Sequence, residues 1–290
     1  QYTSSAASDV YKRQGYDCSW KVKNICVIGS GISGSTIANL LSKKYKVDVY
    51  EKAKGIGGRS SHRRYLNKLG FDHGLQYISP KTSKFEKFCS RLQKKRVLKK
   101  WQGPHNFDHS KVLENKKHTK LIGAKGNNAI SKYLLKNINC IFGYELFKIE
   151  RIRKNWKLSF LNGDVKYYEI LIISIPFAQS KKLLKKFLPN FFKNKKVKME
   201  ANITVMTVTN KIKNNFSSFL FNDEVIGWAA KENSKKRFKY KYDLWTIQST
   251  FKWANRNISN YRNNKKKFTN FLINRFCLLY TSDAADDVYC

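Results

Sequence analysis

Short apolar runs and amphipathic stretches alternate along this chain and predict a strand–helix–strand unit near its start. Residues 25–28 are apolar without a break, which is typical of a strand buried on both faces of a parallel sheet. A second strand is expected at residues 47–50. The stretch between them predicts an amphipathic helix, because four apolar residues share one side: Ile32, Ile37, Leu40 and Leu41. This order indicates a βαβ unit.

Later segments predict a hairpin, a returning strand and a second sheet. Strands at residues 156–160 and 165–168 flank an Asn-Gly-Asp turn, which favours a hairpin. The apolar run 170–175 predicts a parallel strand that returns to the first sheet. Residues 201–251 alternate as three strands, which predicts an antiparallel sheet over a substrate cavity. The remaining expected elements are a polar strand at 71–78 and helices at 84–97, 180–188 and 265–276.

The turn after the first strand has the glycine spacing of a dinucleotide-binding site. Gly29, Gly31 and Gly34 form G-x-G-x-x-G, and Glu51 ends the second strand 51 − 29 = 22 residues after the first glycine. The three glycines permit a tight turn, close approach of a pyrophosphate and close helix packing, in that order. Glu51 is placed to accept hydrogen bonds from a ribose diol. The alternative is a glycine-rich turn without a ligand.

A second glycine turn follows the acid and favours flavin over nicotinamide. Gly57, Gly58 and Arg59 come shortly after Glu51 and Lys52. A guanidinium on such a turn can reach the same pyrophosphate, and a plain NAD domain needs no second phosphate clamp there. FAD is therefore the expected cofactor. The alternative is a solvated turn with a surface arginine.

The segment 71–78 is unusually polar for a strand. Gly74 would allow close approach of the backbone to a flat ring, and His73, Gln76 and Tyr77 supply hydrogen-bonding groups beside it. These three residues are the candidates for lining the flavin. The alternative is a half-buried strand whose polar groups are satisfied within the protein, and a histidine such as His73 is more often a structural hydrogen-bonding group than a base.

The charge balance is strongly basic, yet its distribution does not predict a nucleic-acid site. The formal net charge is +38, from 58 Lys and Arg against 20 Asp and Glu. The lysines are spread along the chain among asparagines and form no single stripe interleaved with stacking aromatics, so no specific nucleic-acid partner is expected. The rival reading is a basic nucleic-acid-associated protein that keeps a vestigial Rossmann domain.

Composition also bears on the compartment. No window approaches the length of a membrane span, so none is expected. The six cysteines are scattered without a C-x-x-C pair, which argues against a metal site and a disulfide framework and makes a reducing cytoplasm the default.

Both ends of the chain differ from its body. The first methionine is Met199, and residues 278–290 contain no lysine. The tetrapeptide at 8–11, Ser-Asp-Val-Tyr, resembles Asp-Asp-Val-Tyr at 286–289. We therefore expect residues 1–14 and 278–290 to be non-native, adapter-like tails on a fragment of a longer protein.

Several motifs together resemble the renalase-like branch of the flavin amine-oxidase superfamily: VIGSGISGSTIANLL, VYEKAKGIGGRSSHRR and FDHGLQY, then GAKGNNAI, IISIPFAQSKKLL, WAAKENSK and LWTIQSTFKWANRNI. The resemblance covers about residues 22–275. It implies non-covalently bound FAD, with Arg64 and the segment 72–77 near the flavin. The implied reaction is hydride transfer from an unproductive dihydronicotinamide isomer to FAD, followed by reoxidation by oxygen to give peroxide.

The chain departs from this family at two places. Ser60 stands where methionine often follows Gly-Gly-Arg, and residues 252–290 contain no counterpart of the family's C-terminal Gly-Asp segment and helix. We therefore expect a fragment without its C-terminal FAD segment, in which FAD binding or activity is impaired.

Together these patterns predict an α/β protein with an FAD-binding Rossmann-like domain on a parallel sheet and a substrate domain on a mostly antiparallel sheet. The first is expected at 22–80 and 121–190, and the second at 81–120 and 191–276. The expected function is an FAD-dependent oxidoreductase acting on a small molecule, with amine oxidation or desaturation as alternatives. The residues expected to bind the cofactor are Gly29, Gly31, Gly34, Glu51, Lys52, Gly57, Gly58, Arg59, Arg64 and Gly74.

Overall fold

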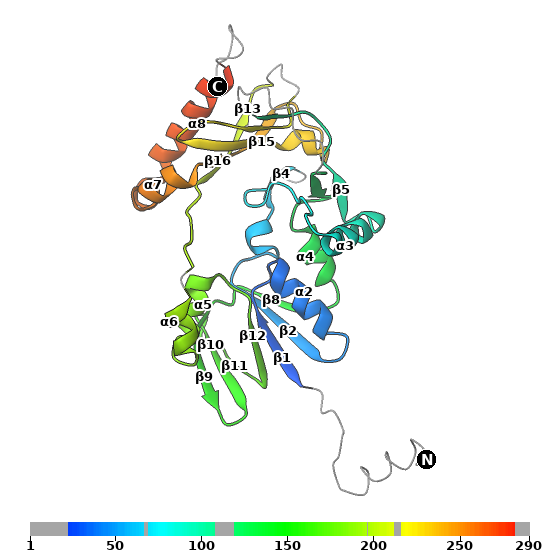
Figure 1. The fold of residues 1–290 in the computed structure, drawn as a ribbon, viewed down its shortest axis with the longest axis vertical. Helices are drawn as coiled ribbons and strands as arrows, with labels where there is room; N and C mark the ends of the chain where they lie inside the picture. Colours follow the sequence, from blue (N-terminus) through cyan, green and yellow to red (C-terminus); the bar gives the residue numbers. More distant parts are fainter. Residues whose placement is uncertain (1–22, 67–68, 108–118, 196, 212–215, 282–290) are drawn as a thin grey trace, which may run out of the picture.

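The computed structural model describes residues 23–66, 69–107, 119–195, 197–211 and 216–281. Two main sheets lie at opposite ends of an elongated molecule, with shorter strands and helices between them (Figure 1). The chain is an α/β protein, with a parallel, Rossmann-like sheet in one half and antiparallel sheets elsewhere. The predicted fold class is confirmed.

The parallel sheet has four strands, and every neighbouring pair in it runs parallel. Helix α2 (Ile32–Leu41) connects the first two strands, as the glycine motif predicts. Val27 and Val49 are fully buried in this sheet, which explains the unbroken apolar runs. The predicted return of the chain is confirmed, because β12 pairs directly with β1. In order across the sheet the strands are β12 (Ile170–Ile173), β1 (Asn24–Ile28), β2 (Lys46–Glu51) and β8 (Asn139–Phe142).

An antiparallel sheet of three strands packs beside the parallel one. Strands β10 (Asn155–Phe160) and β11 (Val165–Tyr168) form the predicted hairpin, and β9 (Leu146–Ile152) lies on the other side of β10. Fully buried Leu158 and nearly buried Phe160 join this sheet to the apolar core beneath β1 and β2.

The second main sheet has five strands, and its first four run antiparallel. Helices α7 (Phe251–Asn263) and α8 (Lys265–Thr281) lie beside it (Figure 1), with Trp245 and Phe276 fully buried in the shared core. The predicted helix near the end is confirmed, whereas α7 was not predicted. In order across the sheet the strands are β13 (Thr204–Thr209), β16 (Asp243–Ser249), β15 (Ile226–Lys231), β14 (Ser218–Leu220) and β6 (His105–Phe107), the last pairing parallel with β14.

Smaller elements connect the two halves. Their strands form the antiparallel pairs β3–β4 and β5–β7, and Leu92 of α3, Leu98 of β5 and Ile130 of α4 pack in one core. These elements are β3 (Arg63–Tyr65), β4 (Leu69–Phe71), β5 (Leu98–Lys100), β7 (Leu121–Gly123), α3 (Ser83–Lys94) and α4 (Ala129–Leu134).

Three predicted elements need correction. The strand expected at 71–78 ends at Phe71, because the backbone and side chain of Asp72 bond to side chains instead of to a neighbouring strand. The helix expected at 180–188 begins earlier and ends earlier, as α5 (Phe177–Leu184). A separate helix, α6 (Pro189–Asn194), starts at the following proline, which suits a first helical position. The helix expected at 84–97 ends at Lys94, and Arg96 adopts φ +57°.

Within the described ranges, no helix combines the length and apolar character needed to span a bilayer. Cys26, Cys89 and Cys140 are free thiols, whereas Cys277 is disulfide-bonded.

Candidate functional site

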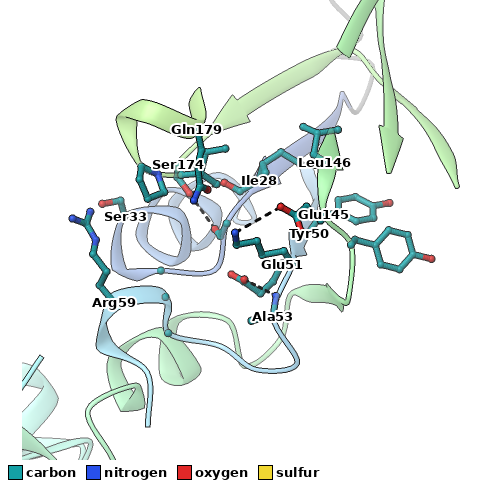
Figure 2. A pocket seen from close by; sticks show the side chains of 18 of the residues that line it. Ile28, Ser33, Tyr50, Glu51, Ala53, Arg59, Glu145, Leu146, Ser174 and Gln179 are labelled. Atoms are coloured by element: carbon teal, nitrogen blue, oxygen red, sulfur yellow. Dashed lines mark hydrogen bonds and ion pairs between the residues drawn. The ribbon is translucent and has the colours of Figure 1, made fainter. Parts of the chain in front are cut away.

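A cavity of about 840 Å³ opens at the carboxyl ends of β1 and β2 (Figure 2). Three parts of the chain contribute to its wall: the first glycine turn, the second glycine turn and the three-stranded sheet of β9, β10 and β11. Ligands of open α/β sheets bind at this edge, where strands end and helices begin. The cavity is therefore lined by most of the residues that were predicted from the sequence to bind the cofactor.

The three glycines of the first turn differ in what limits them. Gly29 has φ +100° and donates its N–H to the carbonyl of Tyr50 at 2.8 Å. A Cβ on Gly34 would lie 2.0 Å from the Gly29 oxygen, so only glycine lets α2 pack here. Gly31 is different, because φ is −68° and the nearest atom to a Cβ would be 4.0 Å away. The protein itself does not require glycine at 31, and the space above it lies in the cavity.

The second glycine turn lies directly against the first. The N–H of Gly57 donates to the Ser30 carbonyl at 3.2 Å, and Gly57 and Gly31 form an isolated parallel bridge. Gly58 begins the short 3-10 helix η1 (Gly58–Ser60), which carries Arg59. The Arg59 side chain is exposed at the cavity wall near Ser33 (Figure 2). It has no hydrogen bond or ion pair with any residue that the structure describes, so its five donors are available.

Glu51 is fixed in the cavity wall by three hydrogen bonds. Its Oε2 accepts from the Ser30 N–H at 2.9 Å and from the Ser30 hydroxyl at 2.7 Å, and its Oε1 accepts from the Ala53 N–H at 2.9 Å. The side chain is 7% exposed. A carboxylate has about four lone-pair positions, so one remains for a ligand hydroxyl. Lys52 lies at the rim, paired with Glu145 at 3.7 Å.

The far end of the cavity was not predicted from the sequence. Leu146, Phe147 and Leu161 line it, and Phe147 and Leu161 are 53% and 64% exposed. Apolar side chains left open beside polar groups suit a flat aromatic ring. Phe147 lies in β9 and Leu161 directly follows β10, and apolar residues at such positions in the sequence are equally typical of a core.

The segment 72–77 contributes only Leu75 to this cavity. Gln76 is buried and its amide donates to the carbonyls of Asp72 and Gly74. Tyr77 packs against the rings of Trp101 and Trp228.

His73 is half-buried outside the cavity, and burial together with Arg63 lowers its pKa. A Cβ on Gly74 would lie 2.1 Å from the Arg59 carbonyl, so this glycine admits backbone instead of a flat ring. Arg64 is exposed on β3, outside the cavity.

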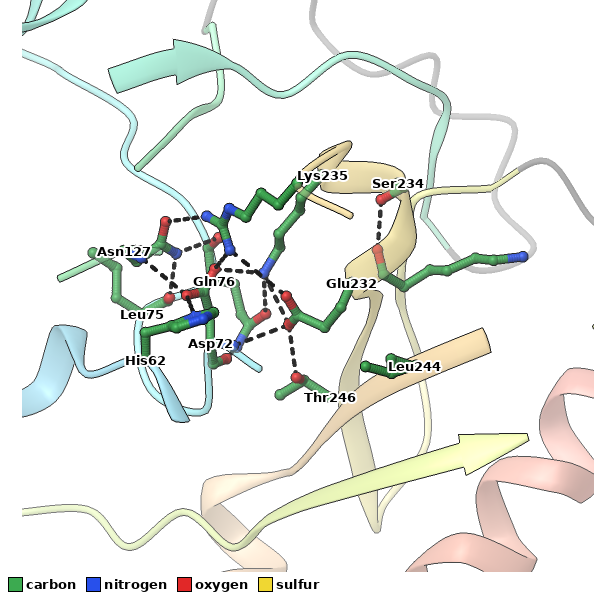
Figure 3. A network of polar contacts seen from close by, with 12 residues as sticks. His62, Asp72, Leu75, Gln76, Asn127, Glu232, Ser234, Lys235, Leu244 and Thr246 are labelled. Atoms are coloured by element: carbon green, nitrogen blue, oxygen red, sulfur yellow. Dashed lines mark hydrogen bonds and ion pairs between the residues drawn. The ribbon is translucent and has the colours of Figure 1, made fainter. Parts of the chain in front are cut away.

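A buried charge network lies beneath this segment (Figure 3). The Lys235 ammonium is 2.9 Å from both Asp72 Oδ2 and Glu232 Oε1, and all three side chains are 0% exposed. Arg237 Nη1 lies 2.6 Å from the same Asp72 oxygen, and His62 Nδ1 lies 2.8 Å from the other. Burial alone would raise the pKa of Asp72, but Lys235, His62 and Arg237 outweigh it and hold that pKa well below its usual range.

Sequence reasoning missed the distal members of this network. Glu232 and Lys235 lie three residues apart on the 3-10 helix η2 (Glu232–Lys235), and Arg237 follows it. In a lysine-rich chain these charges look like a solvated surface. Charged side chains are almost never fully buried without partners, and here the partners come from residues about 160 positions earlier.

Known proteins share parts of this fold. Residues 27–92 match the family described as NAD(P)-binding Rossmann-like domain. A putative protoporphyrinogen oxidase from Exiguobacterium sp. 255-15 has a similar structure, with a TM-score of 0.60 at 10% identity over 78% of this chain and 77% of that chain. A cofactor-binding mutant of putrescine oxidase gives 0.60 at 10% identity over 82% and 77%. A protein from Pyrococcus furiosus gives 0.56 at 12% identity over 78% and 79%. Residues 27–92 are therefore similar to an NAD(P)-binding Rossmann-like domain, and the chain shares its overall fold with these solved structures.

Proposed function

We propose that this chain is an FAD-dependent oxidoreductase of the renalase-like type, which takes a hydride from a small substrate. One observation carries the proposal. The open position at Gly31, the spare lone pair of Glu51 and the unpaired guanidinium of Arg59 all face one cavity. Two phosphates and a ribose need such a set of groups.

Different residues of the cavity would bind different parts of the cofactor. The backbone N–H groups at the start of α2 and the Arg59 guanidinium would hold the pyrophosphate. Glu51 would accept from the ribose diol, and its charge would disfavour a 2′-phosphate. The apolar end at Leu146, Phe147 and Leu161 would take the adenine.

Flavin is favoured over nicotinamide by the second glycine turn. Gly57 and Gly58 adopt positive φ values of +133° and +52°, and these bring Arg59 back beside the first turn. A dinucleotide held by Glu51 and the first turn alone would leave Arg59 without a role. When bound, the flavin supplies hydride acceptance, with oxygen as the subsequent oxidant.

The protein's own part is to hold the cofactor and to order the chain beside it. Leu75 lies in the cavity wall, and its N–H donates to the Arg59 carbonyl at 2.9 Å. The segment 72–77 is thereby tied to the phosphate-binding turn on one side and to the buried network on the other. His73, Gln76 and Tyr77 remain candidates for lining the flavin ring beyond this cavity, and we assign no proton transfer to any of them.

Two substrate classes are separated by one experiment. The FAD-loaded protein is mixed without oxygen with dihydronicotinamide isomers or with a set of amines, and flavin absorbance is followed. Bleaching by the isomers alone supports the renalase-like reaction. Bleaching by amines alone supports the alternative, which the likeness to putrescine oxidase favours. A cofactor that neither class reduces contradicts both.

A further inference from the structure

A second groove is lined by residues of α5, of α6 and of the segment that follows α6. These helices lie on the flank of the half that contains the parallel sheet (Figure 1). The volume of the groove is about 460 Å³. Phe177 and Phe192 lie together in it with ring centroids 5.4 Å apart. Four lysines also line the groove: Lys181, Lys193, Lys195 and Lys198. An apolar floor with a cationic rim fits a ligand that is both apolar and negatively charged.

The charge on this flank is concentrated and largely unpaired. Residues 170–199 contain no Asp or Glu. From neighbouring elements, Glu200 pairs with Lys198 at 2.8 Å, and Glu150 lies close enough to Lys186 for that lysine to help lower its pKa. By contrast Lys181, Lys185, Lys193 and Lys195 are exposed and make no ion pair with any described residue. The positive field here is therefore not neutralised by the protein.

Large apolar side chains stand among these lysines. Leu188, Phe191, Val197 and Met199 are each about half exposed, at 49%, 50%, 51% and 46%. Four such residues within twelve positions, rimmed by lysine, differ from the single exposed apolar residues that any protein surface carries. Leu188, Val197 and Met199 have no aromatic ring to stack on a nucleobase, whereas all four side chains can enter the acyl boundary of a bilayer.

We propose that this α5–α6 surface (Lys181, Lys185, Leu188, Phe191, Lys193, Lys195 and Val197) binds the face of an anionic lipid bilayer. The lysines would lie at the level of the lipid phosphates, and Leu188, Phe191 and Val197 would enter the interface. Such a site combines electrostatic attraction with apolar burial, and both are needed for stable peripheral binding. The inference is independent of the cofactor and of the proposed reaction.

Sedimentation with lipid vesicles tests this proposal on the full chain. Vesicles of phosphatidylcholine containing phosphatidylserine are compared with vesicles of phosphatidylcholine alone. The triple change Lys181→Gln, Lys193→Gln and Lys195→Gln should weaken binding to the anionic vesicles roughly a hundredfold, since each lysine near such a surface contributes about fivefold. Phe191→Ser should weaken it by up to roughly tenfold, including at high salt.

A matched control separates this surface from the general basic charge. Lys84→Gln, Lys87→Gln and Lys94→Gln remove the same charge from α3, which lies on the other side of the molecule (Figure 1). This control should retain nearly all binding. Equal losses in the two triple variants would overturn the proposal and assign vesicle binding to net charge. Binding of the same proteins to RNA is measured in parallel. If the triple change at Lys181, Lys193 and Lys195 weakens RNA binding but leaves vesicle binding unchanged, the proposal is also overturned.

Discussion

The ammonium of Lys235 lies 2.9 Å from the carboxylate of Asp72, a residue 163 positions earlier, and both side chains are fully buried. This pair ties the second main sheet to the segment that follows β4. It also explains why that segment is not a strand, since its polar groups are satisfied by side chains from η2.

Removing the cation should destabilise the whole molecule. In Lys235→Met the negative charges of buried Asp72 and Glu232 lose the nearest positive charge. Removing one partner of a buried ion pair typically lowers the free energy of unfolding by about 3–5 kcal/mol. Urea unfolding should show this loss, whereas Lys239→Met at an exposed position should leave the free energy of unfolding nearly unchanged. Equal stability of the two variants would show that the buried pair does not hold the halves together.

Stability should fall in acid for the same reason. The folded state lowers the pKa of Asp72, so the carboxylate contributes stability that is fully present above the ordinary pKa of about 4. This contribution is lost progressively as the pH falls from that range toward the lowered value. The free energy of unfolding, measured against pH, should decrease below about pH 5 more steeply for the wild type than for Asp72→Asn. Parallel curves would contradict this assignment.

Two glycine variants should separate ligand binding from folding. Gly31→Ala places a methyl group in the cavity without a clash, so the melting temperature should hold while FAD affinity falls. Gly34→Ala places its Cβ 2.0 Å from a backbone oxygen, so the melting temperature itself should fall. Thermal melts and flavin titrations of both variants provide the comparison. An unchanged FAD affinity in Gly31→Ala would mean that the pyrophosphate does not pass over this turn.

Arg59 and Arg64 were both predicted to bind the cofactor, but their substitution should affect FAD affinity differently. Arg59→Ala should weaken FAD binding by about 1.5–3 kcal/mol, as expected for lost hydrogen bonds to a charged group. Arg64→Ala should have a much smaller effect, because Arg64 lies outside the cavity. Flavin fluorescence titrations measure both, and a larger loss in the Arg64 variant would move the phosphate site away from η1.

The local parts of this structure were predictable, and the distant contacts were not. The turn at Gly29–Gly34, the strand carrying Glu51 and the hairpin around Gly163 follow from nearest-neighbour chemistry, and each forms as expected. The network of Asp72, Lys235 and Arg237 depends on burial, which a charged sequence does not reveal.

Contacts between distant parts of the chain also explain why some elements were predicted wrongly or were not predicted. Residues 72–77 are unusually polar for a strand, and their polar groups bond to side chains from another part of the chain. Residues 251–263 form α7 after Thr250, whose hydroxyl accepts from the Trp253 N–H at 3.2 Å. The apolar end of the cavity is formed by exposed Phe147 and Leu161, which in sequence resemble core residues.

Retention of flavin by the purified chain tests whether one cavity holds FAD between the two glycine turns. The full chain is incubated with FAD, freed of unbound ligand by gel filtration, and its visible spectrum is recorded beside that of Arg59→Ala. The proposed site predicts that the wild-type protein elutes with bound flavin and is yellow, and that the variant loses most of this flavin. A colourless wild-type protein, or a variant that retains as much flavin, would contradict it.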